Sequence, residues 1–432
     1  MSIKPLALAL ILAPCFAFAE NTDLNESRGS YACMSADFSQ LERRSKKTDV
    51  RFATFNISLN RNNAGQLIAD LRDPDDQLGT GGSDTQIKAV AEIIQRVRPD
   101  VLLLNEFDYD ANGTALTLFQ ENYLSVSQNG QAPVHYQYHY NAESNTGIPS
   151  GIDLNGDGSV GGPNDAFGFG FFPGQYGMVL LSKYPINTDQ VRTFQSFRWQ
   201  DMPAAALPDN ADTAAPGDYF SPEALEVFRL SSKSHWDIPV RIGYRDIHVL
   251  AAHPTPPVFD GPEDSNGRRN HDEIRLWADY IGPDKQSRYI YDDKGRYGGI
   301  KNSSAFVIMG DYNADPLDGD SFNGAINQLL THSAVDATIA PASIGAYVDA
   351  ESEGQINDAH LGNAALDTGD FNPASPGNLR IDYVLPSKRG MEPICGGVFW
   401  PTPADDTYPL VGSGFPAVSS DHHLVWMDLK IK

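Results

Sequence analysis

Residues 85–107 read TQIKAVAEIIQRVRPDVLLLNEF, and this stretch carries the clearest structural signal in the chain. In its first half, apolar residues recur at the spacing of one buried helix face. Pro99 ends that helix, because proline disfavours helical backbone in the residue before it. Val101–Leu104 is wholly apolar, as expected of a strand that is buried on both faces. We therefore predict a helix over 85–98 and a strand over 101–104.

Strand patterns and amphipathic helix patterns of the same kind recur along the chain before and after residues 85–107. Residues 50–57, VRFATFNI, alternate between apolar and polar positions as a strand does. Further strands are expected at 176–182, 246–252, 305–309, 378–385 and 424–431, and a further helix at 273–281. Long segments rich in Gly, Pro and Asn separate these elements, at 58–84, 108–175, 187–237, 283–303 and 338–377. The pattern predicts an α/β protein with a large sheet component and long loops, a kind of loop that is usually functional or disordered.

The N-terminus has the pattern of a secretory signal peptide. Lys4 precedes an apolar run, and Ala17-Phe18-Ala19 has the small-x-small form that signal peptidase cleaves. The apolar run is too short to span a bilayer. We therefore expect a signal peptide at 1–19, no stable membrane insertion, and a secreted or periplasmic protein.

The remaining chain divides into a short lead-in and one domain. Residues 20–47 are polar and irregular, and 48–432 contains no internal repeat or strong linker. We expect one catalytic domain with long loop insertions over 48–432, and a monomer. Removal of 1–19 leaves two of the three cysteines, Cys33 and Cys395. In an oxidising compartment they either pair or stay free thiols, and the sequence leaves both outcomes open.

The overall charge bears on the class of partner. The formal net charge is -24 at pH 7. Broad electrostatic capture of nucleic acid needs lysines and arginines facing the phosphates, so this charge argues against it. A nuclease with a small local basic groove is still compatible with the composition. The surplus of acidic groups also favours attraction of divalent cations.

A set of polar residues lies at the ends of the apolar strands: Asn56, Glu106, His253, Asp311, Asn313, Asp382, Asp421 and His422. Polar groups at strand ends converge on one rim of a sheet, which is where α/β proteins place their sites. Each residue alone is more simply a turn, a cap or a structural histidine. The ordered set carries the information.

In this order and context, the set resembles the endonuclease/exonuclease/phosphatase superfamily. The matching text is FNI around Asn56, LLNEF around Glu106, GMVLLSKYPI from Gly177, HPTP from His253, GDYNADP from Gly310, RIDYV from Arg380 and SSDH from Ser419. The resemblance runs from about residue 48 to the C-terminus. One departure is Leu424, which stands where many members have proline.

This resemblance implies both a fold and a chemistry. The fold is a four-layer α/β sandwich, with two mixed β-sheets packed face to face and flanked by helices. The chemistry is hydrolysis of phosphate mono- or diesters by in-line attack of an activated water, with Mg²⁺ or Mn²⁺ bound. A phosphate ester is anionic and repels a nucleophile, so a hard cation on carboxylate oxygens is needed to neutralise it.

The resemblance also assigns roles around that metal. Glu106 is the expected metal ligand, and Asn56 and Asp421 support the same metal or a second one. Asp382 is expected to orient His422, which contacts the phosphate or acts as the base.

Three further residues complete the catalytic set that the resemblance implies. Asp311 positions the attacking water or helps to protonate the leaving oxygen. Asn313 donates to a phosphate oxygen. His253 acts as general acid or as a second phosphate contact.

Two secondary features each have a functional and a plain interpretation. Asp153, Asn155 and Asp157 have the spacing of a calcium loop that starts like an EF-hand, although Gly-rich turns also produce this pattern. The stretch 167–172 with Tyr176 is aromatic and Gly-rich, so it either walls a pocket or stacks a base, or it only packs the insertion.

Three basic residues are candidates for contact with a substrate phosphate. Arg229 and Lys233 lie upstream of His253, where the deoxyribonuclease branch carries a phosphate-contacting arginine, and Arg269 lies after it. Solvated strand charges, or a helix cap in the case of Arg269, are the alternatives.

The substrate remains open among three hypotheses. A secreted phosphoesterase for small organophosphates fits the acidic composition. An extracellular deoxyribonuclease fits the same motifs, with DNA as the partner. A sphingomyelinase lacks support, because no apolar lipid-docking hairpin is evident. A non-enzymatic alternative is a calcium-stabilised binding protein on this fold, which requires the polar set to be inert.

Overall fold

A computed structural model describes residues 49–75, 83–210, 213–413 and 417–432. The predicted signal peptide, the lead-in and Cys33 lie outside these residues. Cys395 is disulfide-bonded, and its partner also lies outside them. Among the described residues, none of the helices combines the length and apolar character needed to cross a membrane.

The first sheet has six strands in the order β10-β11-β1-β2-β4-β3. Their bounds are β10 (Met391–Val398), β11 (Val425–Ile431), β1 (Asp49–Leu59), β2 (Val101–Phe107), β4 (Met178–Ser182) and β3 (Tyr138–Asn141). β1 and β2 are parallel and the other neighbours are antiparallel, so the sheet is mixed.

The second sheet has five strands in the order β5-β6-β7-β8-β9. Their bounds are β5 (Arg192–Thr193), β6 (His235–Ile242), β7 (Arg245–Ala252), β8 (Ala305–Asp311) and β9 (Asp382–Pro386). β7 and β8 are parallel, and the remaining pairs are antiparallel.

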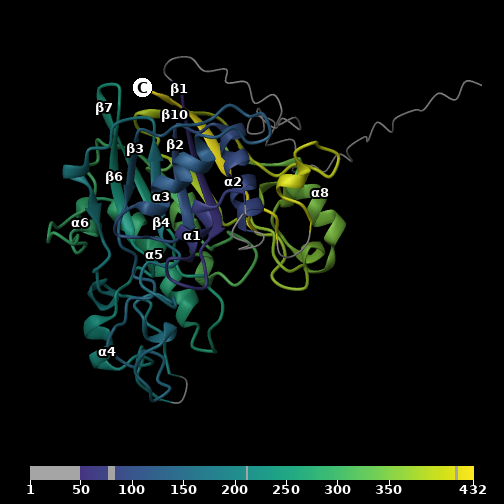
Figure 1. Ribbon diagram of the computed structural model, residues 1–432. Helices are drawn as coiled ribbons and strands as arrows, with labels where there is room; N and C mark the ends of the chain where they lie inside the picture. Colours follow the sequence, from purple (N-terminus) through teal and green to yellow (C-terminus); the bar gives the residue numbers. More distant parts are fainter. Residues whose placement is uncertain (1–48, 76–82, 211–212, 414–416) are drawn as a thin grey trace, which may run out of the picture.

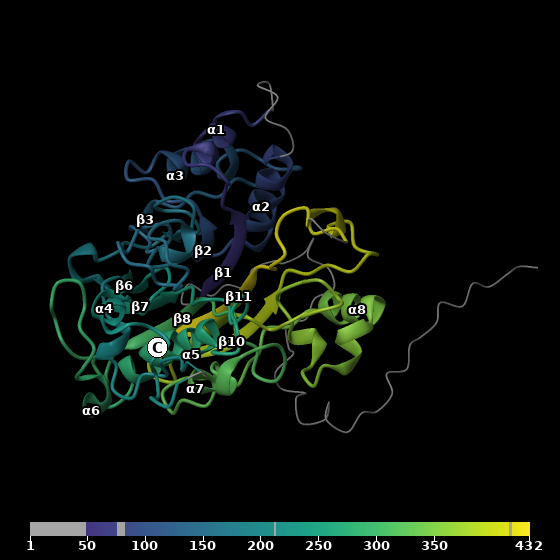
Figure 2. The same cartoon turned by 90° about the horizontal axis from the view of Figure 1, so that it is seen from below.

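The strands pack as two inner layers between two outer layers of helices. One apolar cluster joins the sheets face to face and includes Phe52, Leu103, Trp236 and Val249. Helices α1 (Gln66–Arg72), α2 (Ser83–Val97) and α3 (Thr114–Phe119) cover the first sheet, and α5 (Ser265–Tyr280) and α7 (Asn327–Leu330) cover the second. Figure 2 shows these layers in sequence. The expected four-layer α/β sandwich is confirmed.

The shorter helices lie in the long connections. They are α4 (Pro222–Val227), α6 (Asp284–Ser287) and α8 (Ile344–Glu353). Figure 1 shows α4 far below the sheets and α8 to one side of them. The five segments expected as long loops each contain a helix: α1 in 58–84, α3 in 108–175, α4 in 187–237, α6 in 283–303 and α8 in 338–377. Strands β3 and β5 also lie in two of them.

Several elements depart from the predicted pattern, and two of them have a clear physical reason. Helix α5 begins at Ser265, whereas we expected a helix from 273. Its first turns bury polar residues such as Asn270 and Asp272, so the apolar spacing that marks a helix is absent there. Strand β10 was not predicted, since Pro393 and Gly396 are atypical of a strand interior. The strand expected over 378–385 begins only at Asp382.

Candidate active site

The strand directions bring the predicted polar residues to one edge of both sheets. β1 and β2 run parallel, so Asn56 and Glu106 lie at the same edge. β11 is antiparallel to β1, and the residues just before it reach that edge as well. In the second sheet, Asp311 at the end of β8 is the direct register partner of Asp382 at the start of β9.

Asp311 lies at the centre of this group. Its Oδ2 atom accepts a hydrogen bond from Nδ2 of Asn56 at 3.0 Å. The same oxygen is 3.3 Å from Nε2 of His253 and 3.7 Å from Nε2 of His422. Its Oδ1 atom accepts the backbone N–H of Asn313 at 2.9 Å. One buried carboxylate thus joins residues from four separate motifs.

His422 is held on its other side by a second carboxylate. Its Nδ1 atom lies 2.9 Å from Oδ2 of Asp382. The Thr368 hydroxyl donates to that oxygen at 2.9 Å and accepts the backbone N–H of Asp382 at 3.0 Å. Phe371 meets the imidazole edge-on, with ring centroids 5.5 Å apart. These contacts fix both the orientation and the protonation of the ring.

The two imidazoles beside Asp311 have opposite charge states. Burial lowers the pKa of His422, but the Asp382 and Asp311 carboxylates outweigh it and raise that pKa well above its ordinary value. Burial, together with Lys233 and His422, holds the pKa of His253 well below its ordinary value. His422 is therefore an imidazolium at neutral pH. His253 is neutral, so its 3.3 Å contact with Asp311 is a polar contact and not an ion pair.

The backbone at the site is unusually constrained. Gly310 has no room for a side chain, because a Cβ atom there would overlap the carbonyl oxygen of Ala252. This close approach brings the end of β8 against the end of β7, and so Asp311 against His253. Ser58 and Glu106 adopt left-handed backbone, with φ of 46° and 58°. Such conformations are costly for residues other than glycine and cluster at functional sites.

Glu106 has the environment of a cation ligand. Its carboxylate has no hydrogen-bond or ion-pair partner among the residues that the structure describes. Burial, followed by the negative charge of Asp421, raises its pKa to about 7. Two carboxylates without a counter-ion repel each other, and a divalent cation would relieve that repulsion.

The neighbouring oxygens complete a plausible ligand set. Oδ1 of Asp421 accepts the Ser58 hydroxyl at 3.0 Å, and the Ser420 hydroxyl donates to the Asn56 carbonyl at 2.8 Å. These serine contacts hold Asn56 and Asp421 in place. The residues present fit a hard cation with oxygen ligands.

Another trio at the site also has metal-ligand chemistry. Ligand atoms of Asp311, Asp382 and His422 lie within 4.8 Å of one another. We interpret it as a proton-handling chain, because the His422 imidazolium has no lone pair to offer a metal while it bonds to Asp382.

The three basic residues predicted to contact phosphate differ in their surroundings. Lys233 is buried, and its ammonium makes no hydrogen bond to any residue in the described ranges. Arg229 donates to Oδ1 of Asn145 at 2.6 Å and lies over the Phe167 ring. Arg269 donates to backbone carbonyls, including that of Leu230 at 2.8 Å. Of these three, only Lys233 has a cation without a hydrogen-bond partner among the described residues, although burial lowers its pKa.

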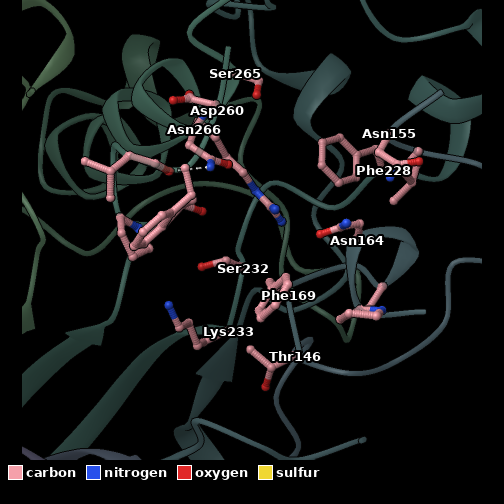
Figure 3. Close-up of a pocket in the computed structure, with 18 of the residues that line it drawn as sticks. Thr146, Asn155, Asn164, Phe169, Phe228, Ser232, Lys233, Asp260, Ser265 and Asn266 are labelled. Atoms are coloured by element: carbon pink, nitrogen blue, oxygen red, sulfur yellow. Dashed lines mark hydrogen bonds between the residues drawn. The ribbon is translucent and has the colours of Figure 1, made fainter. Parts of the chain in front are cut away.

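A cavity of about 730 Å³ opens beside Glu106 and Lys233. Its walls come from the long connections, and Figure 3 shows Lys233, Ser232, Phe169 and Thr146 along one side of it. Glu273 is buried and ties two wall segments together. Its carboxylate accepts the backbone N–H of Ser232 at 2.7 Å and that of Thr255 at 2.6 Å.

The predicted calcium loop forms a compact turn at the surface. Asp153 accepts the backbone N–H groups of Asp157 at 3.1 Å and Gly158 at 2.8 Å. Asp165 closes the loop by accepting the N–H groups of Leu154 and Gly161. These hydrogen bonds hold the turn without a cation, and structural calcium at Asp153, Asn155 and Asp157 stays a prediction.

Several supporting residues were not identified from the sequence. Thr368 and Ser58 bond to predicted site residues, and Glu273 positions the cavity walls. None lies in a recognisable motif. In the sequence, Thr368 and Ser58 are short polar residues in segments expected as loops, and Glu273 is an acidic residue in an expected helix. Residues of these types are common at positions that have no functional role.

This chain is similar to a known protein family. A family model described as Endonuclease/Exonuclease/phosphatase family matches residues 53–422. No match was found among curated protein sequences.

Several solved structures are similar to this chain at low sequence identity. An endonuclease/exonuclease/phosphatase from Beutenbergia cavernae is 18% identical, with a TM-score of 0.47 over 89% of this chain and 72% of that one. Sphingomyelinase C from Streptomyces griseocarneus is 14% identical, with a TM-score of 0.42 over 88% and 99%. A beta toxin variant from Staphylococcus aureus with bound magnesium ions is 15% identical, with a TM-score of 0.41 over 89% and 100%.

Proposed function

The chain belongs to the endonuclease/exonuclease/phosphatase family, whose members are metal-dependent phosphoester hydrolases, and we propose that it hydrolyses phosphate mono- or diesters outside the cytoplasm. One observation carries the hydrolytic proposal. The buried chain His253, Asp311, His422 and Asp382 lies beside Glu106, a carboxylate that lacks a partner among the described residues. The signal-peptide pattern at 1–19 supports secretion.

Each group has a role in this proposal. Glu106, with Asp421 and Asn56, would hold Mg²⁺ or Mn²⁺, whose charge neutralises the phosphate when the ion is bound. The Lys233 ammonium and the Asn313 amide bind phosphate oxygens. One N–H of that amide already donates to the Pro254 carbonyl at 3.2 Å, which orients the group and leaves the other N–H for the substrate.

The proposed reaction moves one proton around a closed path. Asp311 orients a water molecule and accepts one of its protons as the water oxygen bonds to phosphorus. The ester P–O bond breaks, and the departing oxygen takes a proton from the His422 imidazolium. Asp311 then returns its proton to His422 across their 3.7 Å contact. Asp382 stabilises the imidazolium throughout, and neutral His253 keeps Asp311 in position.

The substrate is proposed to be a small organophosphate in preference to DNA. The net charge of -24 repels a polyanion. In addition, Arg229 and Arg269 are already bonded to protein oxygens. Their cations are therefore poorly placed to follow a nucleic-acid backbone.

A panel of substrates tests the proposal. p-Nitrophenyl phosphate, bis(p-nitrophenyl) phosphate and plasmid DNA are assayed with Mg²⁺, Mn²⁺ or Ca²⁺, and again with EDTA. We expect metal-dependent cleavage of a small ester. Glu106→Gln should lower kcat by about 10²-fold or more, the scale of losing one electrostatic contact to the transition state.

Glu392→Gln is the matched control. Glu392 is an exposed glutamate on β10 that lies at the end of the sheet opposite the site, so activity should not change. Efficient nicking of DNA would replace the small-ester proposal with the deoxyribonuclease. If no ester is cleaved with any metal, the protein is a binding protein on this fold and the enzymatic proposal is wrong.

A further inference from the structure

The cavity beside Glu106 is formed by the long loops and not by the sheets. Its lining comes from three segments, 146–176, 219–233 and 255–269, together with Glu106. At about 730 Å³, it is within the usual range for sites that bind a small organic molecule. Because it opens at the proposed phosphate site, a bound ester would place its organic group here.

One buried polar group in the lining lacks a partner. Thr255 lines the cavity, and its buried hydroxyl makes no hydrogen bond to any residue that the structure describes. Its backbone is fixed on both sides, by Glu273 at the N–H and by Asn270 at the carbonyl, at 2.6 and 2.8 Å. A buried hydroxyl held in this way is costly unless a ligand or water satisfies it.

Aromatic side chains also line the cavity. Phe169 is exposed to it, and Figure 3 shows this ring between Lys233 and Asn164. Phe259 is 94% exposed at the rim and has left-handed backbone, with φ of 67°. The rim is held by Asn266, whose side chain donates to the Val258 carbonyl at 2.7 Å. An exposed aromatic ring on an anchored loop beside the cavity is available to stack on a bound ligand.

We propose that this cavity binds the organic group of the phosphate ester, and that the group is a planar aromatic heterocycle of nucleobase size. The ring stacks on Phe169 and Phe259, and the Thr255 hydroxyl bonds to the bound ester. This inference rests on the proposed function for the position of the phosphate. It adds the identity of the group attached to that phosphate.

The lining favours a heterocycle over an acyl chain, which phosphate esters also commonly carry. Side-chain amides of Asn155, Asn164 and Asn266 lie among the aromatic rings, and they suit the polar edge of a base better than an acyl chain. The two carboxylates at the rim are already engaged. Asp260 accepts the Asn266 N–H at 2.6 Å, and Glu263 accepts the Gly261 N–H at 3.1 Å. Both carboxylates keep their negative charge, so a quaternary ammonium is the competing occupant that the binding test has to exclude.

Equilibrium binding to the full-length protein in EDTA tests the ring preference without turnover. The probes are adenosine 5′-monophosphate, ribose 5-phosphate and phosphocholine, measured by calorimetry. We expect the nucleotide to bind at least about tenfold more tightly than ribose 5-phosphate, from the usual strength of base stacking. Equal affinity for these two probes, or tighter binding of phosphocholine, would overturn the inference.

Two substitutions test the named contacts. Phe259→Ala should weaken nucleotide binding about tenfold and leave ribose 5-phosphate unchanged. Tyr244→Ala is the control, because Tyr244 is an equally exposed aromatic residue in the turn after β6 that does not line the cavity. Thr255→Val should weaken binding of the nucleotide. If it only raises Tm and leaves affinity intact, the hydroxyl has no ligand contact and that part of the inference is wrong.

Steady-state kinetics separates this inference from the proposed function. Thymidine 5′-(p-nitrophenyl phosphate) and methyl p-nitrophenyl phosphate share a leaving group and differ in the ring. We expect a lower KM for the thymidine ester than for the methyl ester. Phe259→Ala should raise the KM for the thymidine ester and leave kcat unchanged. Equal KM values with active enzyme refute the cavity inference and leave the function intact. Ring-selective binding without cleavage of either ester refutes the function and supports the cavity.

Discussion

The Nδ1 atom of His422 lies 2.9 Å from Oδ2 of Asp382, and both side chains are buried. Burial raises the pKa of Asp382 to about 6, although the His422 charge lowers it. Because the pKa of His422 is raised well above its ordinary value, the pair is a charged imidazolium–carboxylate pair at neutral pH. The neutral His253 on the other side of Asp311 makes the two imidazoles chemically distinct.

Asp382→Asn should lower activity by changing the charge of His422. Without the Asp382 carboxylate, only Asp311 and Asp421 still oppose burial, so the pKa of His422 falls and less of the imidazolium is present at neutral pH. We expect kcat to drop by about 10²- to 10⁴-fold, the usual contribution of a positioned acid–base group. The alkaline limb of the pH–rate profile should move to lower pH. An unchanged profile would show that the pair does not set the protonation needed for turnover.

Thr368→Val is the matched control for that variant. It removes the hydroxyl that donates to Asp382 but keeps the carboxylate. We expect a smaller loss of kcat and an alkaline limb close to that of the wild type. An effect as large as that of Asp382→Asn would mean that positioning, and not charge, dominates.

The contribution of Glu106 to stability without metal should fall as pH rises from about 4.5 to about 7, whereas the buried His235, His253 and His423, whose pKa values are lowered, act in the opposite direction. The pKa of Glu106 rises from 4.5 to about 7 on folding, so in this window the folded protein holds a proton that the unfolded chain has lost. Thermal unfolding in EDTA measures this slope. Because Asp108, whose burial raises its pKa to about 7, contributes in the same direction, the difference between wild type and Glu106→Gln isolates Glu106.

Addition of Mg²⁺ at pH 7.5 should raise the Tm of the wild type, because a ligand that binds only the folded state stabilises it. The same addition should have little effect on Glu106→Gln. Equal stabilisation of both proteins would place the metal elsewhere.

Gly310→Ala should damage the site more than the fold. The added Cβ would overlap the Ala252 carbonyl oxygen and push β8 away from β7, moving Asp311 relative to His253. We expect kcat to fall by about 10²-fold, as for a displacement of about 1 Å, with a stability loss of about 1–3 kcal/mol. Gly243→Ala is the control, since its Cβ would meet open space in the turn between β6 and β7. Its kcat should equal that of the wild type.

Arg51→Met should destabilise the protein without affecting catalysis. The Arg51 side chain is buried, bonds to both oxygens of Asp428 at 2.7 Å and lies 4.1 Å from the Trp426 ring centroid. Its removal leaves Asp428 without its buried counter-ion, and we expect a loss of about 3 kcal/mol on chemical denaturation. Arg241→Met breaks a more exposed pair with Asp246 and should change stability little. A similar loss in both variants would contradict this interpretation.

Much of the fold followed from local patterns. The apolar run Val101–Leu104 and the helix before it were placed correctly, because a buried strand and an amphipathic helix each leave a periodic signal. The start of α5 was missed, since Asn270 and Asp272 make buried hydrogen bonds that the apolar period cannot encode. β10 was missed because its pairing with β11 outweighs the poor strand propensity of Pro393.

The site was predicted as a set of residues but not as a geometry. The sequence order of the motifs pointed to Glu106, Asp311 and His422, and the structure brings Asp311 and His422 together. The sequence could not show that His253 is neutral while His422 is charged, because those states depend on burial and on charges that are distant along the chain. Nor could the sequence show that Lys233 has no side-chain hydrogen bond among the described residues, whereas Arg269 donates to backbone carbonyls.

The amino-acid sequence by itself determined the strands and helices that alternate along the chain and the chemical types of residue at the strand ends, since both are local properties. Only the tertiary structure decided that Asp311 accepts a hydrogen bond from Asn56 and lies between two imidazoles. It alone placed Thr255 and Phe259 around one cavity beside Glu106. Register and loop conformation depend on contacts between residues that are far apart in the chain, and no local pattern records them.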